Sequence, residues 1–323
     1  MLSNIVVKNN LISIYMKKFL LYSALTLILV LVILVILPFV FKDKIQQKVQ
    51  TELDNTIDAT IVLDDFSLNL FKNFPNFTAS LSKFGIIGKG EFENDTLMYF
   101  NTLSIELDLG SVLAGNPKIV GIIALEPYFK VKFGESGKGN FDIMKPSDAP
   151  TDTTAAEPST FKMAIEEIGL VGGTFIYDDV PGNMQMVVNG LDGIVSGDVA
   201  LSVSQLKAVV TAKSIDFIMD KVKFMDAATA EFTSDITVDL DAFKFTFGNN
   251  ASKLNNMPIR FEGWLAMPYD DIDMDFTFDL YQATFKDLLS MVPAIYATNF
   301  EGLKATGNVA CNGFIKGTYN DVS

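Results

Sequence analysis

The sequence predicts a mainly β protein in which an N-terminal transmembrane helix is followed by an elongated, curled antiparallel β-sheet, groove-like, with a few helices. Three observations support this fold class. One uncharged apolar run lies near the N-terminus, apolar and polar residues alternate along most of the remaining chain, and few segments have the apolar spacing of an amphipathic helix. The chain has 323 residues, 49% of them hydrophobic, so it can bury a large core without disulfides.

The apolar run extends from Phe19 to Phe41 and contains no charged residue. As an α-helix it is about 34 Å long, enough to cross a hydrocarbon core of about 30 Å. The alternative, a cleaved signal peptide, fits less well because the run exceeds the usual length of about 7–15 residues. Two lysines flank each end: Lys17, Lys18, Lys42 and Lys44. Met16 directly precedes the first pair and is an alternative to Met1 as the true start.

An amphipathic helix is predicted directly after the anchor, within residues 43–59. Its apolar side chains recur every four residues, at Ile45, Val49, Leu53 and Ile57. Two roles are open for this helix. It can pack on the sheet beneath it, or it can cap the end of a β groove.

Beyond residue 59 the apolar period changes from 3.6 to 2, which indicates strands with one apolar face. Three segments carry the pattern: Leu97, Tyr99, Leu103, Ile105, Leu107 and Leu109; Ile123, Leu125, Phe129, Val131 and Phe133; and Ile272, Met274, Phe276, Phe278 and Leu280. A fourth segment switches parity near Asp241, from Ile236, Val238 and Leu240 to Phe243, Phe245 and Phe247. This switch predicts a turn or a bulge at that point.

Turn-forming residues divide the β region. Gly- and Asn-rich runs at 113–118, 133–140 and 180–184 predict hairpin connections between antiparallel strands. Residues 146–160, PSDAPTDTTAAEPST, contain no large apolar side chain and predict a flexible linker loop. The linker separates a first half, residues 42–145, from a second half, residues 161–323.

The formal net charge of −14 is unevenly distributed. Residues 1–48 contain six lysines and one aspartate, a net charge of +5, so residues 49–323 carry −19. A domain this acidic repels the phosphates of nucleic acids. We therefore expect no nucleic-acid partner.

Side chains suited to catalysis or metal binding are scarce. The sequence has no histidine, which removes the usual general base of hydrolases and the commonest zinc ligand, and its one cysteine, Cys311, cannot form an internal disulfide. The aspartate run at 270–275 fails the EF-hand pattern, because Phe276 and Gln282 stand where that loop needs Gly and Glu. The glycine-rich run at 134–140 fails the phosphate-loop pattern. We predict no enzyme activity, no metal site and no cofactor.

Several motifs together resemble a known family. They are the anchor and, within residues 70–92 and 107–143, Phe74-Pro75-Asn76, Asp108-Leu109 before Ser111-Val112-Leu113, Pro127, and Gly139-Asn140-Phe141-Asp142-Ile143. This combination resembles the N-terminal region of AsmA-like proteins of Gram-negative envelopes, although that family often has Trp in place of Phe141. Residues 285–321 are similar to a later AsmA block. Because AsmA-like proteins usually continue well past such a block, we expect this chain to be a fragment or a short paralogue.

The resemblance implies a single-pass protein of the cell inner membrane with residues 1–18 in the cytoplasm and the bulk of the chain in the periplasm. The flanking lysines do not decide this orientation, since three lysines lie on each side of the helix. The implied role is lipid transport and outer-membrane biogenesis. The implied partners are a phospholipid or other acyl lipid, the inner membrane, and envelope proteins.

On this hypothesis acyl chains lie in an apolar β groove. Its expected lipid-binding residues are Ile105, Leu107, Leu125, Val131, Val238, Leu240, Met274, Phe276 and Phe278. The same alternation would also suit a closed β-sandwich core. Two other functions remain open: an assembly factor that binds outer-membrane proteins through its sheet edges, and a structural spacer.

Overall fold

The computed structural model describes residues 47, 50–53, 55–69, 73, 75–115, 118–145, 162–198, 202–268, 271–289, 304 and 306–319. The N-terminal segment 1–18, the predicted transmembrane helix at 19–41 and the predicted linker at 146–160 lie outside the described residues. Within the described ranges, no helix combines the length and the apolar character needed to cross a bilayer.

The described residues form one large sheet of 13 strands with short helices at its margins. The elements are β1 (Thr60–Val62), β2 (Asp65–Asn69), β3 (Asn76–Ile87), the 3-10 helix η1 (Gly90–Phe92), β4 (Thr96–Asp108), α2 (Leu109–Leu113), β5 (Lys118–Phe133), β6 (Lys162–Asp179), β7 (Met184–Gly197), β8 (Val203–Met219), β9 (Val222–Asp239), β10 (Lys244–Leu254), β11 (Met257–Ala266), β12 (Ile272–Thr284), α3 (Phe285–Leu289) and β13 (Asn308–Tyr319). The mainly β prediction is confirmed. The closed sandwich is not what forms, because the described strands belong to one sheet and not to two.

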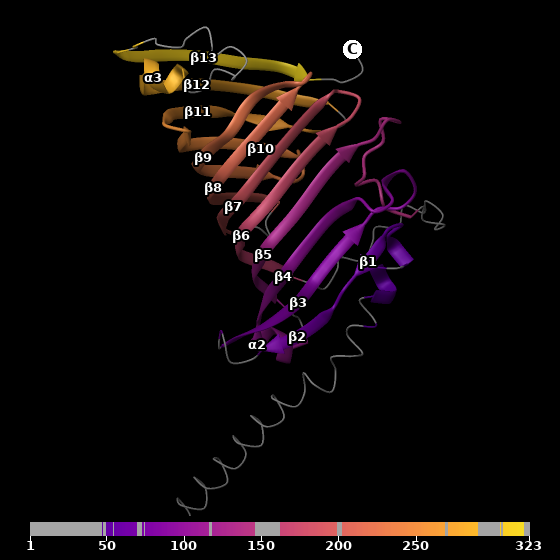
Figure 1. Cartoon of the computed structure of the whole chain (residues 1–323). Helices are drawn as coiled ribbons and strands as arrows, with labels where there is room; N and C mark the ends of the chain where they lie inside the picture. Colours follow the sequence, from indigo (N-terminus) through magenta and orange to yellow (C-terminus); the bar gives the residue numbers. More distant parts are fainter. Residues whose placement is uncertain are drawn as a thin grey trace, which may run out of the picture.

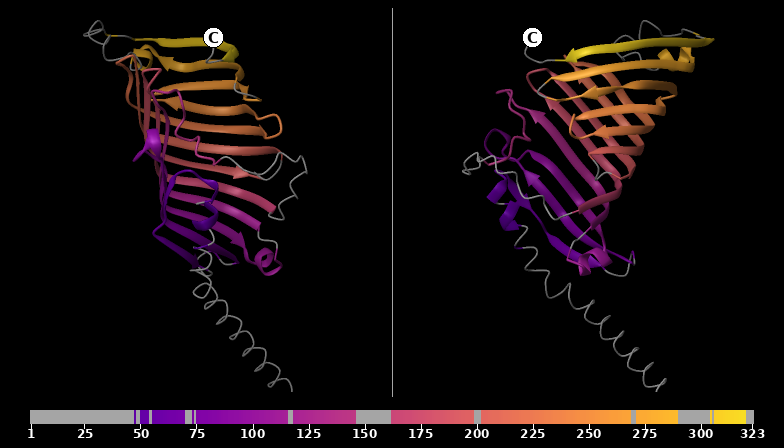
Figure 2. Two further views of the ribbon diagram at one scale, coloured as in Figure 1. Left: turned by 90° about the vertical axis from the view of Figure 1, so that its right-hand side faces the viewer. Right: turned by 180° about the vertical axis from the view of Figure 1, so that it is seen from behind.

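The strands lie beside one another in chain order, β3 to β13, with β1 and β2 both paired to β3. Figures 1 and 2 show them stacked in a single twisted, curved layer from the indigo N-terminal strands to the yellow β13. All neighbouring pairs are antiparallel except β5 and β6, which are parallel. The fully antiparallel prediction was wrong at this pair.

The long connection between Phe133 and Lys162 permits the parallel pair. A parallel neighbour needs a crossover of a dozen or more residues, whereas an antiparallel one needs only a tight turn. The predicted hairpin at 133–140 is therefore no connection between neighbouring strands. Its turn, in which the Gly137 amide donates to the Gly134 carbonyl, instead folds the chain back onto the end of β5.

A line of β-bulges crosses the sheet and bends its long strands. At this line one residue of each strand is left out of the pairing, and the apolar residues change from odd to even positions, or the reverse, while they stay on the same face. Five strands each carry a residue with positive φ at this line: Lys83 in β3 (49°), Glu126 in β5 (46°), Gly172 in β6 (68°), Gly190 in β7 (60°) and Ala227 in β9 (49°). The bends are visible in Figure 1 where the long central strands change direction.

Because of the bulges, some side chains lie on a different face of the sheet from the one predicted. Leu103 pairs with Leu81 and Phe100 pairs with Phe84, on either side of Lys83. Met98 and Phe100, and not Leu97 and Tyr99, therefore share a face with Leu103. The predicted parity switch near Asp241 is confirmed as a turn, because β9 ends at Asp239 and β10 begins at Lys244.

A compact apolar cluster closes the N-terminal end of the sheet. Its buried members are Ala59, Phe84, Ile86, Leu97, Phe100 and Ala124. Leu53 and Ile57 pack against this cluster, and the Ile57 amide donates to the Leu53 carbonyl, as in a helix. The predicted helix within 43–59 thus packs on the sheet where the structure describes it.

Candidate functional site

One face of the sheet is apolar along most of its length. Directly paired residues on neighbouring strands place their side chains on the same face. Three rows of such partners can be followed across the sheet: Ala79, Ile105, Ile122, Ile168, Val195, Ala208 and Ser234; Leu81, Leu103, Ala124, Leu170, Gly193, Val210, Phe232, Ser252 and Ile259; and Leu206, Ile236, Phe247, Gly263, Phe276 and Ile315. We call the whole face of the sheet that carries these rows the apolar face.

None of the residues in these three rows is charged. Their polar members are the small side chains of Ser234 and Ser252. The Ser234 hydroxyl donates to the carbonyl oxygens of Asp235 and Gly248, so it is satisfied by the backbone. The rows extend over β3 to β13, about 50 Å at the usual spacing between strands.

Aromatic rings gather on the apolar face over β9 to β12. Phe261 stacks on Phe232 with ring centroids 5.9 Å apart, and Phe247 and Phe276 each lie about 6.0 Å from Phe261. Phe247 and Phe276 also contact each other at 5.9 Å. The set of predicted lipid-binding residues contains Phe276 but misses Phe232, Phe247 and Phe261. Their alternation within β9, β10 and β11 is the sequence signal that could have found them.

Seven of the nine predicted residues lie on the apolar face, in two groups. Ile105, Leu107 and Val131 lie on β4 and β5, where Leu107 pairs with Phe77 and Val131 with Tyr177. The second group lies on β9 and β12: Val238, Met274, Phe276 and Phe278. The structure does not bring the two groups into contact, because the strands of β6 to β8 separate them.

The other two predicted residues do not lie on the apolar face. Leu125 pairs with Thr102 and Val171 on the opposite face, since the bulge at Glu126 reverses the phase between Leu125 and Phe129. Leu240 lies in the turn after β9, with its amide donating to the Ser202 carbonyl. Both side chains are exposed, by 40% and 47%. Their assignment to an inward-facing surface was wrong.

The opposite face carries the charged side chains of the strands, together with exposed apolar side chains over β5 to β8: Leu125, Val171, Ile194 and Val209. The aspartates of β12 alternate with the apolar residues as predicted, and Asp275 accepts from Lys316 Nζ at 2.7 Å. Ser80 and Ser104 share a hydrogen bond of 3.0 Å between β3 and β4. Among the described residues, no group of three or more acidic, cysteine or histidine side chains is arranged to hold a metal ion.

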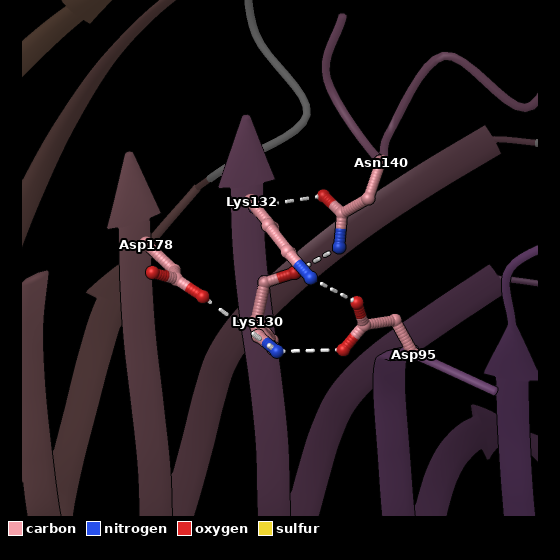
Figure 3. Close-up of polar contacts among 5 residues, drawn as sticks. All are labelled: Asp95, Lys130, Lys132, Asn140 and Asp178. Carbon is pink, nitrogen blue, oxygen red and sulfur yellow. Dashed lines mark hydrogen bonds and ion pairs between the residues drawn. The ribbon is translucent and has the colours of Figure 1, made fainter. Parts of the chain in front are cut away.

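A polar cluster holds the end of β5 on this opposite face (Figure 3). Asp95 accepts from Lys130 Nζ and Lys132 Nζ, both at 2.6 Å, and Lys130 Nζ also lies 3.8 Å from Asp178. Asn140 is 1% exposed. Its side-chain amide donates to the Lys130 carbonyl at 2.7 Å, and its Oδ1 accepts from the Lys132 amide at 2.9 Å. The cluster thus joins the residue before β4, strands β5 and β6, and the returning turn.

Opposing effects act on the Asp95 carboxyl. Burial, the largest single effect, raises its pKa, but the hydrogen bonds and charges of Lys130 and Lys132 together exceed it and place the pKa below its ordinary value. The hydrogen bond to Asp95 raises the pKa of Lys132. Asp95 and Lys132 therefore keep their charges near neutral pH, which suits a structural cluster and not a proton-transfer site.

Three of the motifs that resemble the AsmA family have structural roles here, whereas the anchor and Phe74 lie outside the described residues. The Asn140 motif continues to Ile143, which packs against the N-terminal cluster and accepts from the Asp58 amide at 2.6 Å. Pro127 is fully buried at the Glu126 bulge, a place where a strand tolerates proline. The Asp108 side chain accepts from the Ser111 amide and caps α2.

No protein-family model matches this sequence, and no curated protein is significantly similar to it. The resemblance to AsmA-like proteins therefore rests on the sequence motifs alone.

Proposed function

We propose that the chain binds the acyl chains of lipids on its apolar face and carries them through the periplasm of a Gram-negative envelope, with residues 19–41 as its inner-membrane anchor. The single observation that carries this proposal is the unbroken succession of neutral, mainly apolar partners over β3 to β13. A soluble protein normally covers such a surface with a second layer. Here the described strands form one layer, and acyl chains can take the place of the second.

The energetics of lipid transfer favour a surface of this kind. A two-chain phospholipid has about thirty methylenes, and at about 0.8 kcal/mol for each one, exposing them to water would cost on the order of 25 kcal/mol. A lipid that crosses an aqueous space therefore needs continuous apolar contact. The apolar face offers that contact, and the lack of charge in its rows suits acyl chains better than head groups.

The acidic character of the chain fits a sheet with one face for acyl chains and one face in water. Charged side chains lie on the opposite face, as with the aspartates of β12, and keep that face in water. The proposed mechanism needs no catalysis: the apolar face shields acyl chains, and head groups stay in water at its margin.

Photo-cross-linking of the full chain in Gram-negative cells tests the proposal. A benzophenone amino acid is placed at Phe276 on the apolar face, and in a matched control at Thr277, the next residue on the same strand but on the opposite face. A second pair, Ile105 and Ser104, tests the other end of the sheet. After irradiation, mass spectrometry of the purified protein identifies any attached lipid.

We expect lipid adducts at Phe276 and Ile105 and few or none at Thr277 and Ser104. The substitution Phe276→Arg should then reduce the adducts formed at the neighbouring Phe247. Equal labelling of both faces would indicate contact with bulk membrane, and the absence of adducts at Phe276 and Ile105 would reject acyl binding. Trp264 lies on the opposite face of β11, beside Asp275, and its fluorescence reports that each variant is folded.

A further inference from the structure

The short helix α2 is held firmly at one margin of the sheet. The Asp108 carboxylate accepts from the Ser111 amide at 2.6 Å, and the Ser111 hydroxyl accepts from the Lys118 amide at 2.8 Å. These two contacts tie the end of β4 to the start of β5 at the base of α2. The tip of the connection, residues 113–115, is exposed.

The tip of α2 is apolar, and its last backbone amides have partners. Leu113 is 71% exposed, and residues 109–117 contain no charged side chain. The amides of Ala114 and Gly115 donate to carbonyls of the preceding turn, both at 3.0 Å. Backbone groups that already have partners cost little to remove from water. The tip of α2 is therefore suited to an apolar environment.

Three other connections at the same margin of the sheet are acidic. They carry Asp198 after β7, Asp241 between β9 and β10, and Asp271 before β12. Carboxylates repel the anionic head groups of a bilayer and favour water. The α2 connection therefore suits contact with a membrane better than these three connections do.

The proposed anchor holds the α2 end of the molecule near the inner membrane. Its apolar run ends at Phe41, and Gln47 is the first residue that the structure describes. The six steps of chain between them span no more than about 22 Å even when fully extended. Figure 1 shows α2 at the same end of the molecule as the indigo residues that follow Gln47, whereas β13 lies at the opposite end.

We propose that the tip of α2, residues 113–115, rests in the head-group region of the bilayer that holds the anchor, with Leu113 against the first methylenes of the acyl chains. This inference rests on the membrane anchor of the proposed function. A single leucine binds a bilayer weakly. Because the anchor keeps the tip at a high effective concentration near the surface, a weak contact is enough to orient the sheet.

This contact places one end of the apolar face at the membrane. Leu107 on β4 directly precedes the Asp108 cap of α2, and it pairs with Phe77 on β3 and with Ile119 on β5. As register partners, these three side chains share the apolar face. An acyl chain that leaves the bilayer beside α2 therefore meets apolar side chains first.

Fluorescence quenching by nitroxide lipids tests the contact. In a Cys311→Ser background of the full chain, Ala114→Cys carries an environment-sensitive fluorophore beside the native Leu113. The matched control is Leu240→Cys, which is also exposed at this margin but lies in the acidic turn after β9. A third label, at Phe276→Cys, reports acyl chains on the apolar face. The chain is reconstituted into vesicles of phosphatidylethanolamine and phosphatidylglycerol, with or without a nitroxide on the acyl chains close to the head group.

We expect the nitroxide to quench the Ala114 label at least about threefold more than the Leu240 label, because only the first lies at the depth of the acyl chains. Leu113→Asp should remove most of this difference, since a carboxylate is unfavourable at that depth. The Leu113→Asp chain should still float with the vesicles, and unchanged Trp264 fluorescence of the unlabelled variant shows that it is folded.

The three labels separate this contact from acyl binding. Quenching at Phe276 without quenching at Ala114 would overturn the contact and leave acyl binding intact, whereas the reverse pattern would support the contact and reject acyl binding. Equal quenching at Ala114 and Leu240 would also overturn the contact. So would an Ala114 label that is shielded from water but not quenched, because it would indicate a protein partner. A chain that does not float with the vesicles would overturn the contact together with the anchor.

Discussion

The ring of Phe276 on β12 lies over Gly263 on β11. The two residues are register partners, and a Cβ atom added at Gly263 would overlap both the edge of this ring and the carbonyl oxygen of Asp275. A glycine inside a strand leaves a gap in the side-chain layer, and an aromatic ring from the next strand can fill it. This contact joins the aromatic group of the apolar face across two strands.

Gly263→Ala should destabilise the protein by about 2–3 kcal/mol, the usual cost of forcing extra atoms into a packed site. The φ of 150° at Gly263 adds strain for any other residue. Gly248→Ala on β10 is the matched control, because an added Cβ there has no neighbour within 4 Å. Its effect should lie between zero and about 1 kcal/mol of stabilisation. Urea unfolding followed by Trp264 fluorescence measures the stability of both variants. Equal effects would show that the packing of the Phe276 ring does not require a glycine at position 263.

Asn140→Ala should cost about 2–4 kcal/mol of stability. The substitution leaves the Lys130 carbonyl and the Lys132 amide without their side-chain partner at a site where Asn140 is almost fully buried. Asn101→Ala removes a comparable amide that bonds Glu126 at the exposed surface, so it should cost less than about 1 kcal/mol. Thermal unfolding measures the stability of both variants. Equal losses for Asn140→Ala and Asn101→Ala would argue against a structural role for the Asn140 motif.

Asp95→Asn should destabilise the protein by about 1–3 kcal/mol because it leaves Lys130 and Lys132 without their carboxylate. The figure lies below that for a fully buried pair, since these side chains keep 16–24% exposure. Asp64→Asn breaks the exposed pair with Lys83 and should have a much smaller effect, because solvent screens that pair. If the two substitutions have equal effects, the Asp95 cluster is no stronger than a surface ion pair.

The contribution of Asp95 should depend on pH with a definite sign. Its pKa in the folded protein is below its ordinary value of about 3.9, so the unfolded chain binds the proton more readily. The stabilisation is therefore complete above about pH 4 and is lost as the pH falls through the folded pKa. The difference in unfolding free energy between the native chain and Asp95→Asn should shrink below pH 4, and a difference that grows there would contradict the assignment.

Sequence reasoning succeeded where a strand has no bulge. From Ile272 to Leu280 the alternation predicted the correct face, because the register of β12 with β11 is regular over that stretch. It failed at Leu125 because the bulge residue next to it is Glu126. A glycine at this position would have suggested a positive φ, but a glutamate does not. The change of face after Leu125 could therefore not be predicted from the sequence.

Two further errors have similar causes. Leu240 continues the alternation of Ile236 and Val238, but β9 ends one residue earlier, where Asp239 Oδ1 accepts from the Asp241 and Ala242 amides and begins the turn. The parallel pairing of β5 and β6 could not be predicted either, because residues 146–160 lack the helical pattern that is typical of a crossover connection. The apolar face itself was predictable in kind, whereas the line of bulges that keeps it continuous was not.

The bulge line provides the last prediction, at Ala227 in β9. Its φ of 49° is costly for a residue with a Cβ atom, by roughly 1–2 kcal/mol, and a glycine would remove that strain. Against this gain stands the greater flexibility that glycine gives the unfolded chain, about 0.5–1 kcal/mol. Ala227→Gly should therefore be neutral or stabilising by about 1 kcal/mol. Ala230→Gly, three residues along the same strand in a regular pair with Ala212, has only the cost and should destabilise by about 1 kcal/mol. Opposite signs in urea unfolding would establish the bulge in solution, and equal destabilisation would mean that β9 runs straight through this point.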